Sequence, residues 1–256
     1  MKTKLLLTAL ALASLVRAAS ATTAPIADTE RALERAYLRA SATDLAVAVK
    51  PLDAALAADP KNPALLYTRA FAHYAALPAM RAANDKPAMI AELEKAAALL
   101  DRVKGQPWEA EAAALHGGLL GQLIGLKGGL AGMTLGPKSS SLLARAETAL
   151  PGNPRVLLFR GISLVNTPPN FGGDPAKGAQ LLAQAAEAFA KADATAAAPG
   201  PHWGHADALT WLGLAKQKSG DVAGARVAWE QALALEPDYG WVKFALLPSL
   251  DQKTAK

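Results

Sequence analysis

The sequence predicts an all-α protein, and three observations support this fold class. Alanine occupies 61 of the 256 positions, and it is the residue with the highest helix propensity. Residues that favour strands are sparse, and no stretch alternates apolar and polar residues for long enough to indicate a sheet. Groups of residues also recur along the chain at spacings typical of paired helices. We therefore expect stacked helical hairpins whose crossings are lined by small side chains.

The composition excludes several classes of protein. The chain contains no cysteine, which rules out disulfide frameworks, iron–sulfur clusters, Cys-ligated zinc and a cysteine nucleophile. With 52% hydrophobic and 19% charged residues, the chain has a globular rather than a disordered composition. We expect no cofactor.

The first 21 residues have the pattern of a secretory signal peptide. Lys2 and Lys4 precede an apolar run that ends in small residues at 19–21, and this run is too short to span a bilayer. We expect cleavage before Thr22 and a periplasmic or secreted protein that does not span the membrane. Cleavage also removes Arg17, so the formal charge falls from +5 to +2. This charge gives no support for nucleic-acid binding.

The clearest repeat lies between residues 206 and 239. Gly213 and Ala225 are small where two helices would cross, Trp229 would fill the space beside them, and Pro237 would end the second helix. This spacing resembles the 34-residue tetratricopeptide repeat. The resemblance implies an α-solenoid that binds other proteins or peptides.

Weaker copies of the same pattern precede it. Asn62-Pro63 and Asn153-Pro154 each open an expected first helix, and Leu182 stands at the position of Trp229. In chain order, we expect a second helix over 48–60, a first helix from 62, a second helix over 89–97, helices over 115–126 and 141–150, hairpins over 154–198 and 206–239, and a terminal helix over 241–250. Together these predict one domain, 22–256, with a tetratricopeptide-like solenoid of about five helical hairpins and a C-terminal capping helix.

Two narrower resemblances concern particular segments. Residues 153–158, 166–174 and 203–209 are similar to a family of uncharacterised exported bacterial tetratricopeptide repeat proteins. The turn Phe171-Gly172-Gly173-Asp174, followed by Lys177, resembles the T component of tripartite periplasmic solute transporters. This second resemblance implies an accessory role in handling a small solute.

A glycine-rich insertion covers about residues 117–140. Glycines at 117, 121, 125 and 129, and again at 128, 132 and 136, repeat every four residues and would share a helix face. We interpret this face as a site of close helix packing rather than a membrane dimerisation motif, and we expect the segment to be kinked or partly unwound. Residues 132–139 do not fit a phosphate loop, because Pro137 removes a backbone N–H. Ser139 to Ser141 would cap a helix and, with Lys138, offer a weaker carboxylate or phosphate site.

An aromatic stripe is the main candidate for a binding surface. Tyr67, Phe71 and Tyr74 are spaced to share one helix face. They would either line a concave groove that binds a peptide or protein, or fill the core between hairpins. The same groove would continue along Leu158, Ile162 and Asn166.

Several charged and polar residues are further candidates. Arg69 and Arg160 occupy equivalent positions of two first helices, where they would pair with carboxylates of a neighbouring helix or bind an acidic ligand in the groove. The cluster of His202, His205 and Asp207 is a weak candidate for a metal site.

No catalytic arrangement can be placed in the sequence, because His73 and His116 lie apart from any serine, base or acid partner. The sequence therefore predicts a non-enzymatic, exported scaffold or peptide- and protein-binding module. A small-molecule-binding accessory protein of a solute transporter is the alternative.

Overall fold

A computed structural model describes residues 26–194 and 201–254, and these residues form no strand. The prediction of an all-α protein is thus confirmed for this part of the chain. The predicted signal peptide, 1–21, lies outside the described residues. A first helix covers residues 26–38. The elements that follow are α2 (Ala42–Ala58), α3 (Pro63–Ala75), α4 (Leu77–Ala82), α5 (Lys86–Asp101), α6 (Glu109–Lys127), α7 (Gly129–Ala149), α8 (Pro154–Asn166), η1 (Pro169–Phe171), α9 (Pro175–Ala194), α10 (His205–Lys218), α11 (Val222–Leu235), η2 (Val242–Leu246) and α12 (Leu247–Thr254).

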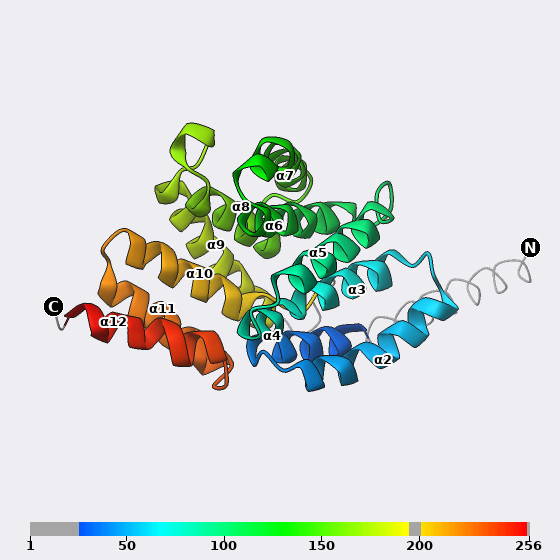
Figure 1. The fold of residues 1–256 in the computed structure, drawn as a ribbon, viewed down its shortest axis with the longest axis horizontal. Coiled ribbons are helices and arrows are strands. Elements are labelled where there is room, and N and C mark those ends of the chain that lie inside the picture. Colours follow the sequence, from blue (N-terminus) through cyan, green and yellow to red (C-terminus); the bar gives the residue numbers. More distant parts are fainter. Residues whose placement is uncertain (1–25, 195–200, 255–256) are drawn as a thin grey trace, which may run out of the picture.

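Neighbouring helices along the chain fold back on one another in pairs (Figure 1). The most extensive contacts join α6 to α7, α8 to α9 and α10 to α11. Further contacts join α3 to α5, α5 to α6 and α9 to α10. None of the helices in the described residues is both long enough and apolar enough to cross a membrane.

Two of the first helices begin in the same way. The side chain of Asn62 accepts hydrogen bonds from the backbone N–H groups of residues 64 and 65, and Asn153 accepts from those of residues 155 and 156. Pro63 and Pro154 then occupy the first helical position, where proline costs nothing because that N–H has no helical partner. The predicted starts of these two helices are therefore confirmed.

Three hairpins share a packing unit in which a glycine of the first helix faces a large side chain of the second. A Cβ added at Gly161 would lie 2.7 Å from Leu182 Cγ, and one added at Gly213 would lie 2.2 Å from Trp229 Nε1. Gly117 faces Leu143 in the same way. Each large residue is fully buried and is followed three positions later by a buried alanine. These alanines are Ala146, Ala185 and Ala232.

The glycine-rich insertion differs from the expectation. We expected it to be kinked or partly unwound, with a helix starting near Ser141, but α7 begins at Gly129 and runs through Pro137. The break lies at Gly128 alone, whose φ of +93° favours glycine. Ser139 caps no helix start: it lies inside α7, where its hydroxyl donates to the Gly117 carbonyl at 2.8 Å. This cross-helix bond helps to keep the segment helical.

Close helix packing occurs at only some of these glycines. Gly117 touches α7, whereas an added Cβ at Gly121, Gly125 or Gly136 would have no neighbour within 4 Å. At the far tip of the hairpin, Leu130 is 85% exposed. The predicted packing role therefore holds at Gly117 and not at those three glycines.

The first helix joins the two ends of the described fold. Leu33 belongs to the core formed by α3, α5 and α6, while Leu38 belongs to the core formed by α8 to α11. Just after the helix, Arg39 forms an ion pair with Glu236 at 3.0 Å. Figure 1 shows this blue helix beside the orange and red C-terminal helices. We call the contact between residues 26–39 and residues 202–239 the seam.

Candidate functional site

The predicted aromatic stripe is buried. Tyr67 and Phe71 have no exposed surface, and Tyr74 is 4% exposed. Phe71 stacks on Trp203 with ring centroids 4.1 Å apart, and Tyr74 stacks on Tyr37 of the first helix at 5.3 Å. These three side chains fill the interior between hairpins, so they line no open groove in this structure.

The remaining predicted groove residues do not form a continuous surface either. Leu158 is buried, Ile162 is partly buried and Asn166 is exposed. Asn166 accepts a hydrogen bond from the Lys218 ammonium at 3.1 Å.

The two arginines of the first helices each have a carboxylate partner on the preceding second helix. Arg69 Nε lies 2.7 Å from Asp53 Oδ1 of α2, and Arg160 Nε lies 3.3 Å from Glu147 Oε2 of α7. Arg69 and Arg160 were expected either to pair with carboxylates of a neighbouring helix or to bind an acidic ligand. These contacts match the first alternative.

The seam contains acidic side chains that are buried, as Glu30 and Asp207 are, or partly buried, as Glu34 is. Glu34 accepts a hydrogen bond from the Gly204 N–H at 2.7 Å. Asp207 is 2% exposed and accepts from the hydroxyls of Tyr37 and Tyr239 at 3.1 and 3.2 Å. Glu30, which is fully buried, accepts from the Thr68 hydroxyl and the backbone N–H of residue 202.

Burial changes the proton affinity of Glu34 and Asp207. It raises the pKa of Glu34 to about 7 and the pKa of Asp207 to about 6, because water solvates a carboxylate better than this interior does. The negative charge of Asp207 also raises the pKa of Glu34, whereas the Gly204 N–H lowers it. Mildly acidic pH therefore favours the protonated forms of Glu34 and Asp207.

Replacing Glu34 by glutamine is expected to stabilise the protein above neutral pH. Below pH 4.5 the carboxyl is protonated in both the folded and the unfolded state. Between pH 4.5 and about 7 only the folded state keeps the proton, so stability falls as the pH rises. Glutamine removes this penalty and keeps an oxygen for the Gly204 N–H. We expect a gain of about 1 kcal/mol at pH 8 and none at pH 4 in urea unfolding.

The exposed residue Glu230 provides the control. Glu230→Gln removes one carboxylate from the surface of α11 and should give no such pH-dependent gain.

Burial lowers the pKa of His73 and of His116, which makes the wild-type protein lose stability as the pH falls below 6.5. This effect cancels when each variant is compared with wild type at the same pH. Equal responses of the two variants would contradict the role of Glu34.

A buried ion pair stands next to the seam. Arg155 is 6% exposed and Glu111 is 7% exposed. The guanidinium donates to both oxygens of Glu111 at 3.0 Å and to the Trp203 carbonyl at 3.3 Å. It thereby ties α8 to α6 and to the segment that covers Phe71.

The proposed metal ligands point to different partners. His205 Nδ1 lies 2.6 Å from Asp193 Oδ2, and His202 Nδ1 lies 3.5 Å from Glu30 Oε2, while Asp207 binds two tyrosine hydroxyls. Within residues 26–194 and 201–254, no three histidine, aspartate or glutamate side chains lie close enough together to hold a metal ion. The weak candidate site at His202, His205 and Asp207 is thus not assembled.

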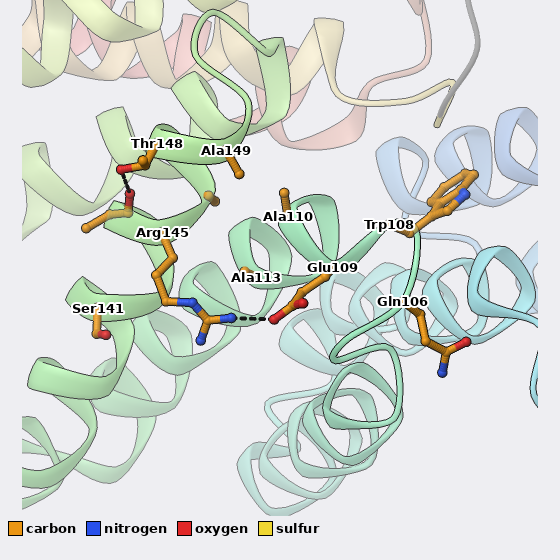
Figure 2. A pocket seen from close by; sticks show the side chains of 11 residues that line it. Gln106, Trp108, Glu109, Ala110, Ala113, Ser141, Arg145, Thr148 and Ala149 are labelled. Atoms are coloured by element: carbon orange, nitrogen blue, oxygen red, sulfur yellow. Dashed lines mark hydrogen bonds and ion pairs between the residues drawn. The ribbon is translucent and has the colours of Figure 1, made fainter.

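A concave site lies in a cleft between the start of α6 and the end of α7 (Figure 2). Its volume of about 690 Å³ lies in the range of ligand-binding pockets. In Figure 2, Arg145 reaches from α7 toward Glu109 of α6, with which it forms an ion pair, and Trp108 lies beyond Glu109. Alanines line the space between them: Ala110, Ala113, Ala144, Ala146 and Ala149.

Trp108, which lines the cleft, has an unusual backbone conformation. Its φ of +82° is rare for a residue with a side chain, and the residue immediately precedes α6. The ring packs against Tyr67 with centroids 5.3 Å apart. No sequence pattern indicates this cleft, because its walls are mostly alanines and the pairing of Glu109 with Arg145 spans two helices.

No protein-family model matches the chain, and no curated protein matches it.

Proposed function

We propose that the protein is an exported helical-repeat module of the tetratricopeptide type that binds a protein or peptide partner and has no catalytic role. The packing unit shared by three hairpins carries this proposal. Gly161 faces Leu182 and Gly213 faces Trp229, and Leu182 and Trp229 stand at equivalent positions of the repeat pattern. Repeats of this kind stack into extended surfaces suited to macromolecular ligands.

The site proposed for the partner is the cleft between α6 and α7. The predicted groove along Tyr67, Phe71 and Tyr74 is filled by the first helix and by Trp203, so binding there would require the seam to open. The cleft, by contrast, presents Trp108, Arg145 and exposed Ala144 without any rearrangement.

Site-specific crosslinking tests this proposal. A photoreactive amino acid replaces either Ala144 in the cleft or the exposed Lys50 on α2, and each protein is irradiated in extract of the cells that produce it. We expect a discrete protein adduct from position 144 and none from position 50. The same adducts from both positions, or none from position 144, would argue against a partner at the cleft.

The alternative is a small-molecule-binding accessory protein of a solute transporter. The cleft volume of about 690 Å³ favours this alternative, because it matches that of sites for compact organic ligands. Binding of a free organic acid by the purified chain, together with no protein adduct from position 144, would support this alternative over the first proposal.

A further inference from the structure

The cleft continues into a second hollow with a different character. This hollow has a volume of about 190 Å³ and shares four wall residues with the cleft: Glu109, Ala113, Ser141 and Arg145. Beyond them it reaches Lys104, Lys138 and His116. One trough therefore runs from the apolar wall at Trp108 to a basic end.

The basic end carries positive charge that the described residues do not neutralise. Its walls contain Lys104, Lys138 and Arg145, against the two carboxylates of Asp101 and Glu109. Arg145 already pairs with Glu109, whereas neither lysine forms an ion pair within the described part of the chain. An anion would be attracted to this end, where the helix walls keep part of the water away.

A buried polar atom without a partner lies beside these lysines. His116 is 3% exposed, and no described residue forms a hydrogen bond with its Nε2. The other ring nitrogen, Nδ1, lies 3.7 Å from Asp101 Oδ1. Burial lowers the pKa of His116, and the charge of Lys138 lowers it further, whereas the carboxylate of Asp101 raises it. The ring is therefore neutral at pH 7, with one ring nitrogen as a donor and the other as an acceptor.

We propose that this trough binds a carboxylate attached to a compact apolar body, with the carboxylate held between Lys104 and Lys138 and the apolar part lying along the alanines toward Trp108. The charges select the head group and the alanine-lined space accommodates the body. Arg145 can leave its ion pair with Glu109 and form one with the carboxylate of the ligand, because a planar guanidinium pairs with any carboxylate. This inference rests on the proposed role as a binding module and adds the chemistry of the ligand.

Two sources supply such a carboxylate: a free organic acid, or the C-terminus of a peptide with an apolar last residue. Isothermal titration calorimetry of the purified full chain distinguishes them. The probes are phenylacetate, its neutral analogue phenylacetamide, and an acetylated tripeptide ending in phenylalanine with a free or an amidated C-terminus. We expect at least one carboxylate to bind with a Kd below about 1 mM, and its amide to bind at least about tenfold more weakly.

Two variants of the trough and one control variant locate the binding. Lys104→Gln/Lys138→Gln should weaken carboxylate binding at least about tenfold, whereas Lys50→Gln/Lys86→Gln, which removes two charges from exposed positions of α2 and α5, should leave it within about twofold. Ala144→Leu should also abolish binding, because the residue lines the cleft yet is exposed. A larger side chain there fills the cleft without disturbing the core.

The outcomes separate this inference from the proposed function. Carboxylates that bind no better than their amides, or that bind unchanged to both cleft variants, would overturn the inference. If the crosslinked protein partner nevertheless persisted, the role as a binding module would stand without it. Tight binding of the tripeptide alone would assign the trough to a peptide C-terminus, and tight binding of phenylacetate alone would assign it to a free organic acid.

Discussion

Replacing Arg155 by alanine is expected to lower the free energy of unfolding by about 3–5 kcal/mol. The substitution leaves the Glu111 carboxylate buried with Asn153 as its one hydrogen-bond donor among the described residues, at 2.7 Å. Burying a charge without a partner is far costlier than losing the attraction between two charges in water. The guanidinium also contacts the Phe189 ring, with 5.7 Å between its central carbon and the ring centroid, so the variant loses packing as well.

Urea unfolding followed by far-ultraviolet circular dichroism measures this effect. Arg31→Ala is the matched control, since Arg31 forms an ion pair with Asp28 while its own side chain is 48% exposed. It should cost less than about 1 kcal/mol. The double variant Arg155→Met/Glu111→Met, which removes both charges, should recover most of the loss. Equal losses for Arg155→Ala and Arg31→Ala would show that burial of the pair has no energetic consequence.

Gly213→Ala is expected to destabilise the protein by about 1–3 kcal/mol, even though alanine is the better helix former. The added Cβ would lie 2.2 Å from Trp229 Nε1, well inside contact distance. Trp229 is fully buried and donates to the Thr210 carbonyl at 3.0 Å, so the indole cannot move away without losing packing and a hydrogen bond. The helices α10 and α11 must therefore separate.

Gly125→Ala makes the same chemical change where nothing opposes it. Gly125 lies within α6, is exposed, and has no atom within 4 Å of an added Cβ. Alanine should stabilise this position by about 0.5–1 kcal/mol. Opposite signs for the two variants in thermal and urea unfolding would confirm that Gly213 serves the helix crossing. Stabilisation by both would contradict this.

The hairpins were predictable because their signals are local. Proline after asparagine at 62–63 and 153–154 specifies a helix start within a few residues. The start of α7 was not predictable, since the dense glycines lower helix propensity. It depends on contacts from another helix, namely the Ser139 bond to Gly117 and the packing of Leu143 on that glycine.

The candidate site was less predictable than the fold. The helical spacing of Tyr67, Phe71 and Tyr74 indicated a shared face correctly, but it did not reveal what covers them. The covering side chains, Tyr37 and Trp203, come from distant parts of the chain, and periodicity says nothing about long-range contacts. The cleft was missed for the same reason, because its charge pairing forms only after α6 and α7 fold together.

The seam also determines when the protein can complete its fold during synthesis. The first helix is made early, yet its partners Gly204, Asp207 and Glu236 are made last. A nascent chain that stops before these residues leaves Tyr37 and Tyr74 without the groups that enclose them, and such long-range closure is slow. The chain thus stays open until nearly all of it has been synthesised.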